Sequence, residues 1–161
     1  MTTVNASLTA RSAPIAVGDK APDFTLPDQD RNDVSLSGLL ARGGDVVLSF
    51  FPLAFTGVCT SEMECFTSDI ARFTDKDTTV VGISCDSFAT QKAFADASKI
   101  GIPLLADMHR EVCKAYGLYW EDLNVSSRGT VVIGSDGVVK WVSAREPGDA
   151  VNNDEVLGQV G

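Results

Sequence analysis

The part of the sequence that most restricts the fold is the segment from Asp45 to Phe51, together with the turn that follows it. Side chains at both odd and even positions of this segment are mostly apolar, as in a parallel strand buried on both faces of a sheet. The segment ends at Pro52. After a short, mostly apolar loop, Thr56 is a typical N-cap residue, which predicts a helix beginning at Gly57. A buried strand joined directly to a helix indicates an α/β domain.

The same turn places Cys59 in the first turn of the predicted helix. The free backbone N–H groups and the positive end of the helix dipole stabilise an anion there, and a thiolate is an anion. A small, inert core residue is the alternative for any single cysteine. Because the strand, the proline, the capping threonine and the helix N-terminus all converge on this thiol, we interpret Cys59 as an activated nucleophile.

Patterns along the rest of the chain predict strands that alternate with helices and then a hairpin around the turn Gly134–Gly137. They indicate an α/β fold with a central mixed sheet flanked by helices and an N-terminal β-hairpin. The predicted strands are 24–26, 34–36, 45–51, 79–85, 103–105, 130–133 and 138–142. The predicted helices are 37–41, 57–73, 87–99 (inner side Phe88, Ala93, Phe94 and Ala97), 107–116 and 153–160.

We expect one folded domain, residues 17–161, preceded by a flexible tail at residues 1–16. The tail is polar, has small side chains and shows no periodicity. The domain is long enough to bury one substantial core, and neither an internal repeat nor a linker divides it.

The charge balance excludes several kinds of partner. The chain has 13 basic and 22 acidic residues, which gives a net charge of −9. This sign disfavours nucleic acid and anionic membranes as partners. No segment is apolar over enough residues to span a bilayer, and the N-terminus lacks an apolar signal core, so we expect a cytoplasmic protein. Whether the acidic surface reflects a high-salt cytoplasm is left open by the sequence.

The chain contains 4 cysteines but no Cys-x-x-Cys pair. This spacing argues against a disulfide framework, a zinc ribbon and a thioredoxin-type dithiol site. His109 and Cys113 are four positions apart in a predicted helix and would face one side of it, as in a base–thiol pair or half of a metal site. A metal needs more ligands than this pair supplies, so packing is the favoured interpretation.

Pro52, Thr56 and Cys59 form the pattern Pro-x-x-x-Thr-x-x-Cys, which resembles the active-site signature of the peroxiredoxins. These are thiol peroxidases on a thioredoxin-like fold, and the resemblance implies that fold here. The surrounding segment FFPLAFTGVCTSE is most similar to the one-cysteine branch related to the actinobacterial alkyl hydroperoxide reductase E.

The resemblance implies a role for each of five residues. Cys59 is the nucleophile, and Arg128 supplies the fixed positive charge, although an ordinary surface charge is its alternative reading. Glu62 orients the arginine, because an unpaired carboxylate so close would disfavour the thiolate. Thr56 can direct its hydroxyl at the sulfur or the peroxide, and Pro52 with the apolar loop keeps bulk water away from the thiolate.

The implied reaction is the reduction of hydrogen peroxide and organic hydroperoxides through a Cys59 sulfenic acid. An external thiol then reduces this acid: thioredoxin, a glutaredoxin-like protein or a low-molecular-weight thiol. No metal, haem, flavin or other cofactor is implied. A homodimer is expected, because in the resembled family loops around the site often form an edge interface. The exposed aromatic residues predicted there are Tyr116, Tyr119 and Trp120, with core packing as the alternative.

None of Cys65, Cys85 and Cys113 matches the resolving positions expected of two-cysteine peroxiredoxins, which favours a one-cysteine cycle. The Cα atoms of Cys59 and Cys65 would lie roughly 10 Å apart along an intact helix, whereas a disulfide tolerates at most about 7 Å. Cys85 would lie near the same sheet edge as Cys59 if their strands are neighbours, so it stays a reserve candidate with Cys65.

Two other functions remain open from the sequence. One is a thiol–disulfide oxidoreductase on the same fold, against which the missing Cys-x-x-Cys pair argues. The other is a non-catalytic redox-sensing or holdase-like module that keeps the site as a switch. The sequence specifies neither the preferred peroxide nor the physiological reductant.

Overall fold

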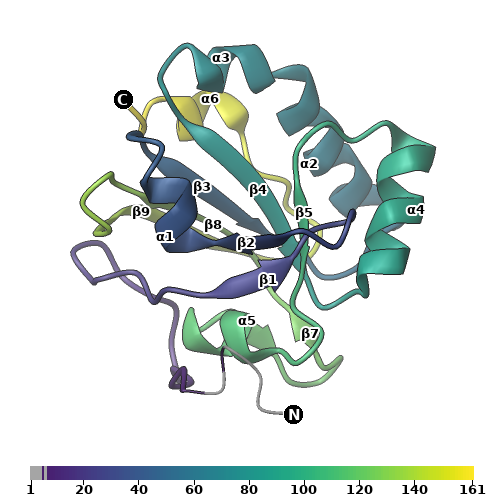
Figure 1. Cartoon of the computed structure of the whole chain (residues 1–161). Helices are drawn as coiled ribbons and strands as arrows, with labels where there is room; N and C mark the ends of the chain where they lie inside the picture. The colour runs from purple at the N-terminus through teal and green to yellow at the C-terminus, as the bar shows by residue number, and fades with distance from the viewer. Residues whose placement is uncertain (1–4, 6) are drawn as a thin grey trace.

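A five-stranded mixed sheet forms the centre of the computed structural model, which describes residue 5 and residues 7–161 (Figure 1). The strand order is β5 (Leu104–Ala106), β4 (Thr79–Ser84), β3 (Val46–Phe50), β8 (Arg128–Ile133) and β9 (Val139–Arg145). β3 runs parallel to β4 and antiparallel to β8, and all of its residues are buried. The predicted α/β class, its mixed sheet and the buried central strand are confirmed.

Two smaller antiparallel strand pairs lie outside this sheet. β1 (Thr25–Pro27) and β2 (Asp33–Ser35) form the predicted N-terminal hairpin. β6 (Tyr119–Trp120) pairs with β7 (Val125–Ser126), which the sequence did not predict. Strands of two residues are too short to show an alternating pattern.

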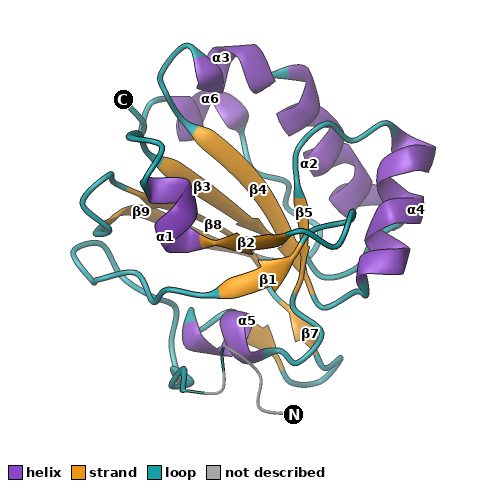
Figure 2. Cartoon of the chain, viewed as in Figure 1, coloured by secondary structure: helices purple, strands orange, loops and turns teal. Residues whose placement is uncertain are grey.

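Helices cover both faces of the central sheet (purple in Figure 2). One face is covered by α1 (Leu36–Leu40) and α5 (Glu111–Ala115). The other is covered by α2 (Gly57–Ser68), α3 (Ile70–Thr74), α4 (Phe88–Ser98) and α6 (Asn153–Leu157). Across the described residues, no helix is both long and apolar enough to cross a membrane.

Each face of the sheet carries its own hydrophobic core. Side chains alternate along β3, because successive residues of a strand point to opposite faces. Val46, Leu48 and Phe50 belong to the core beneath α1 and α5, which we name the α5-side core. Val47 and Phe51 belong to the core beneath α2, α3, α4 and α6, which we name the α2-side core.

The predicted helix at residues 57–73 is in fact two helices, α2 and α3. The break is at Asp69, whose backbone angles (φ −98°, ψ 8°) depart from the helical region. The Asp69 carboxylate accepts a hydrogen bond from Asn153 Nδ2 of α6 at 2.9 Å. The helix break therefore coincides with a contact to a residue far along the chain, and no local sequence pattern predicts the break.

The inner side of α4 differs from the prediction. Phe88, Ala93 and Ala97 are exposed, and the buried residues are Gln91, Phe94 and Ala95. A glutamine occupies this core position because its side-chain N–H group has buried acceptors, Ser84 Oγ at 2.9 Å and the Leu105 carbonyl at 3.1 Å. A search for apolar residues at helical spacing does not identify this buried glutamine.

The helix predicted at residues 107–116 begins later, at Glu111. Its N-cap residue is Arg110 rather than Asp107, although the Asp107 carboxylate accepts hydrogen bonds from the backbone N–H groups of Val112 (3.2 Å) and Cys113 (2.8 Å). His109 lies before the helix and is exposed. The four-residue spacing therefore does not bring His109 and Cys113 to one helical face, and a pair built on that spacing is excluded.

Part of the predicted flexible tail lies against the domain. The Asn5 side chain exchanges hydrogen bonds with the backbone of Thr25, and the Ile15 N–H donates to the Tyr116 carbonyl at 3.0 Å. Arg11 Nε donates to the carbonyl of Ala115 at 3.0 Å. Residues 1–4 and 6 of the tail lie outside the described residues.

These tail contacts generate a prediction about Gly117. Its backbone is left-handed (φ 68°), and a Cβ atom there would overlap the carbonyl oxygen of Ala13. We expect Gly117→Ala to lower the free energy of unfolding in urea by about 1–3 kcal/mol. Gly148→Ala is the control, since no heavy atom lies within 4 Å of its Cβ position. Equal losses in the two variants would contradict the prediction.

Candidate active site

The loop after β3 carries two of the residues singled out in the sequence. Pro52 is buried, and Phe55 adopts a left-handed backbone (φ 67°) that turns the chain toward α2. Thr56 has the extended backbone of an N-cap residue (φ −89°, ψ 154°), so the predicted start of the helix is confirmed. The Thr56 hydroxyl does not cap the helix but donates to the Leu53 carbonyl at 2.7 Å, which closes the loop on itself.

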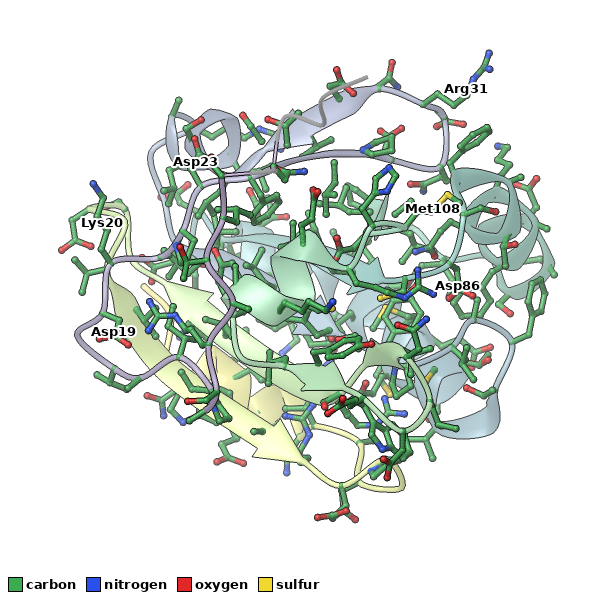
Figure 3. The ribbon with its side chains drawn as sticks, turned by 90° about the horizontal axis from the view of Figure 1, so that it is seen from below. Asp19, Lys20, Asp23, Arg31, Asp86 and Met108 are labelled. Atoms are coloured by element: carbon green, nitrogen blue, oxygen red, sulfur yellow. The ribbon has the colours of Figure 1, made fainter. Side chains whose placement is uncertain are left out.

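Asp86, which the sequence analysis did not identify, ties this loop to the end of β4. The Ala54 N–H donates to Asp86 Oδ2 at 2.9 Å, and Ser84 Oγ donates to the same oxygen at 2.6 Å. Buried Gln91 donates in turn to Ser84 Oγ. Figure 3 shows Asp86 on the same side of the molecule as Met108, which follows β5. The loop therefore depends on groups from the end of β4 and from α4.

Cys59 lies in the first turn of α2 and is 1% exposed. Arg128 Nη2 lies 3.0 Å from Cys59 Sγ, within hydrogen-bond distance for a sulfur acceptor. Arg128 is itself 2% exposed, and its Nε donates to the Pro147 carbonyl at 2.9 Å. A fixed positive charge therefore lies beside the Cys59 sulfur in a site shielded from water.

The parity of β8 explains why Arg128 reaches this sulfur. Arg128 and Val132 are an even number of residues apart, so they point to the same face of the sheet. Val132 belongs to the α2-side core, which also contains Cys59. The long arginine side chain therefore projects beneath the N-terminal turn of α2, although 69 positions separate the two residues.

Glu62 joins Arg128 to a second arginine. It lies one helical turn after Cys59 and is 1% exposed. Glu62 Oε1 accepts from Arg128 Nη1 at 2.5 Å, and Oε2 accepts from Arg145 Nη2 at 3.0 Å and from the Val151 N–H at 2.8 Å. Burial lowers the pKa of the Arg145 guanidinium, while the Glu62 carboxylate acts in the opposite direction.

The sequence analysis missed Arg145, which lies beyond the strand predicted at residues 138–142 but inside β9. Arg128 pairs with Arg145 in the β8–β9 register, so their side chains share a face. Ile133 pairs with Val139 beside the turn, and the register shifts by one residue between Val132 and Ile133. Counting from the turn without this bulge would place Arg145 on the opposite face.

The formal charges of Arg128, Arg145, Glu62 and Cys59 nearly balance. Two guanidiniums face one carboxylate and one sulfur that is neutral as a thiol and negative as a thiolate. With the thiolate present the formal charges cancel, whereas with the thiol one positive charge is left over in a buried site. Since an uncompensated buried charge is costly, the arrangement suits an anionic sulfur.

The other three cysteines lie outside this cluster. Cys65 is exposed on α2. β4 does lie beside β3, as the sequence argument assumed, but Cys85 and Cys113 belong to the α5-side core and Cys59 to the α2-side core. The sheet therefore separates Cys59 from Cys85, which disfavours Cys85 as a direct partner of Cys59.

Tyr116, expected among the exposed aromatic residues, is instead fully buried. Its ring packs against Phe24 and Phe50, and its hydroxyl donates to the Pro22 carbonyl at 2.7 Å. Tyr119 and Trp120 are only partly buried. The core alternative is correct for Tyr116, because its hydroxyl finds an acceptor while the ring is enclosed.

Comparison with known proteins gives a family match over most of the chain. Residues 17–142 match the model of the AhpC/TSA family. The chain is 38% identical over 136 residues to alkyl hydroperoxide reductase E of Mycobacterium tuberculosis, covering 83% of this chain and 88% of that protein. It is 34% identical over 153 residues to a putative peroxiredoxin of Synechocystis, covering 89% of this chain and 76% of that protein.

Solved structures give the same match at the level of the fold. The crystal structure of peroxidoxin BcpB from Mycobacterium tuberculosis superposes with a TM-score of 0.81 at 33% identity, covering 89% of this chain and 94% of that one. A reduced 2-Cys peroxiredoxin of Plasmodium vivax superposes with a TM-score of 0.82 at 29% identity, covering 89% and 79%. The thioredoxin-like fold expected from the sequence is thereby confirmed.

The Glu62 cluster generates a stability prediction. Glu62→Gln would leave two guanidiniums without their buried counter-charge, so we expect the free energy of unfolding in urea to fall by about 3–5 kcal/mol. Glu64→Gln is the matched control, because Glu64 is exposed on the same helix; its change should stay within about 0.5 kcal/mol. Indistinguishable stabilities of the two variants would refute a structural role for the Glu62 charge.

Proposed function

Because this chain belongs to the AhpC/TSA family and is a peroxiredoxin, a thiol-dependent peroxidase, we propose that Cys59 is the thiol that peroxide oxidises. The observation that carries this proposal is the 3.0 Å contact between Arg128 Nη2 and Cys59 Sγ at the N-terminus of α2. The substrates would be hydrogen peroxide and organic hydroperoxides.

In the proposed step the Cys59 thiolate attacks one peroxide oxygen. The S–O bond forms as the O–O bond breaks, and the second oxygen leaves with a proton as water or an alcohol. Cys59 becomes a sulfenic acid. Arg128 stabilises the thiolate before the attack and offers its N–H groups to the oxygens as negative charge develops on them.

Pro52, Thr56 and Glu62 would support this step without reacting. Buried Pro52 keeps water out of the loop above the sulfur. Thr56 fixes the loop through its bond to Leu53 and keeps its hydroxyl oxygen near the helix start, where a peroxide would enter. Glu62 holds the Arg128 guanidinium in place at 2.5 Å. Removal of Glu62 would thus act through the arginine.

We propose that an external thiol completes the cycle. This thiol attacks the Cys59 sulfenic acid, releases water and forms a mixed disulfide that a second thiol reduces. Candidate donors are thioredoxin, a glutaredoxin-like protein or a low-molecular-weight thiol. Exposed Cys65 is on the same helix, and Cys85 lies across the sheet, so neither is placed for an internal disulfide with Cys59.

We further propose that the protein is cytoplasmic and has one folded domain, residues 17–161.

A homodimer through the loop near Thr56 is part of the proposal. Leu53 and Phe55 in that loop are 38% and 54% exposed, which is unusual for large apolar side chains. Burying them against a second copy would remove this apolar surface from water. We expect a dimer mass in light scattering at micromolar concentration, and a monomer mass would contradict this part of the proposal.

The first test of the mechanism replaces the proposed nucleophile. Cys59→Ser should abolish peroxide consumption while the protein stays folded, because a hydroxyl is a poor nucleophile at neutral pH. Cys65→Ser is the control and should retain activity, since its thiol is exposed and outside the cluster. A sulfenic-acid probe applied after one equivalent of peroxide should label Cys59. Labelling mainly at another cysteine would overturn the assignment.

The second test concerns Arg128. Arg128→Gln should slow the oxidation of Cys59 in stopped-flow experiments by about 100-fold or more, because a donor to the breaking O–O bond is lost. The deficit should persist at high pH, where the thiol is ionised in both proteins. Arg42→Gln, at an exposed arginine, is the control and should react at the wild-type rate. Equal rates for Arg128→Gln and wild type at high pH would restrict Arg128 to an effect on ionisation.

A further inference from the structure

A pair of thiols, Cys85 and Cys113, lies in the core on the opposite face of the sheet from Cys59. Cys85 follows β4 and Cys113 lies in α5, 28 positions further along the chain. Their sulfur atoms are 3.8 Å apart, and the residues are 7% and 0% exposed. Both belong to the α5-side core, so the pair is a site of its own, separated from the Arg128 cluster by the sheet.

The surroundings of this pair disfavour a charged Cys113 sulfur. The nearest charged group is Asp107, whose carboxylate already accepts the N–H groups of Val112 and Cys113. Contact with Cys85, followed by burial, raises the pKa of the Cys113 thiol far above its ordinary value. No guanidinium contacts either sulfur among the described hydrogen bonds, in contrast to Cys59.

We propose that Cys85 and Cys113 form a second redox site, in which excess hydroperoxide converts the two thiols into an intramolecular disulfide. Cys85, the more exposed of the two, reacts first: its sulfur takes one peroxide oxygen to form a sulfenic acid, and the other oxygen leaves as water or an alcohol. The Cys113 sulfur then attacks the Cys85 sulfur, the S–O bond breaks, and the Cys113 thiol proton passes to the leaving hydroxyl, which is released as water. Two thiols lose two electrons in total, and one peroxide is reduced.

Formation of the S–S bond requires only a small movement of the two sulfur atoms. The sulfurs must close from 3.8 Å to the length of an S–S bond, about 2.05 Å. Cys113 lies in α5, a helix of only 5 residues, so the movement needed is one of this short element or a rotation about the Cα–Cβ bonds of the two cysteines.

Burial favours a disulfide over the other chemistry that this cluster suggests, a metal ion. Cys85, Cys113 and Asp107 place ligand atoms within 4.8 Å of one another. An ion there would require two thiolates and a carboxylate in an apolar core, which leaves a net negative charge with a divalent ion. A disulfide carries no charge and needs no further ligand, so it suits the core that surrounds the pair.

The test uses protein that lacks Cys59, so its result does not depend on the proposed peroxidase cycle. Cys59→Ser protein is treated with excess hydrogen peroxide and analysed by intact mass and by peptide mapping. We expect a loss of about 2 Da, restored by dithiothreitol, and a disulfide-linked peptide that contains Cys85 and Cys113. The same loss should persist when Cys65→Ser is added and disappear when Cys85→Ala or Cys113→Ala is added.

Three results would overturn the proposal. One is that Cys85 and Cys113 remain unmodified thiols in the peptide map at peroxide concentrations that oxidise exposed Cys65. Another is oxygen added separately to the sulfurs of Cys85 or Cys113 without a link between them. The third is one zinc ion per chain in native mass spectrometry that is lost in Cys113→Ala, which would make the cluster a metal site. Peptide mapping of the Cys59→Ser protein shows whether the Cys85–Cys113 disulfide forms, even if an alanine variant fails to fold.

Discussion

The pairing of buried Glu62 with Arg128 and Arg145 is the interaction on which the rest of the site depends. It joins α2 to β8 and β9, and through the Val151 N–H it also fixes the segment after β9. A carboxylate one turn from Cys59 would by itself oppose a thiolate. Because two guanidiniums surround it, the carboxylate instead holds Arg128 against the sulfur. The stability of the fold and the state of the sulfur are therefore set by the same contacts.

The central sheet separates two cysteine environments of opposite electrostatic character. On the α2 side, Cys59 lies at a helix N-terminus with a guanidinium 3.0 Å away, where an anionic sulfur is stabilised. On the α5 side, Cys85 and Cys113 contact each other within an apolar core, where a charged sulfur is disfavoured. Thiols of one chain can thus differ in reactivity because the two faces of a sheet solvate them differently.

Much of the fold was predictable because its signals are local. The mostly apolar segment of β3 indicated a central strand, and Thr56 marked the start of α2. Predictions failed where a polar group has a buried partner that lies far away in the sequence. Gln91 is such a case, since its acceptors are Ser84 and the Leu105 carbonyl, and Asp69 at the break between α2 and α3 is another.

The sequence by itself determined the α/β class, the position of Cys59 at a helix N-terminus and, through the resemblance to the peroxiredoxins, the choice of Arg128 and Glu62. Only the tertiary structure decided that Arg145 shares the face of Arg128, because one extra residue in β9, opposite the step from Val132 to Ile133, sets the parity of that strand pair. It also decided that Cys85 meets Cys113 rather than Cys59. Neighbouring strands place their ends together, but the alternation of side chains along each strand decides which face a cysteine occupies.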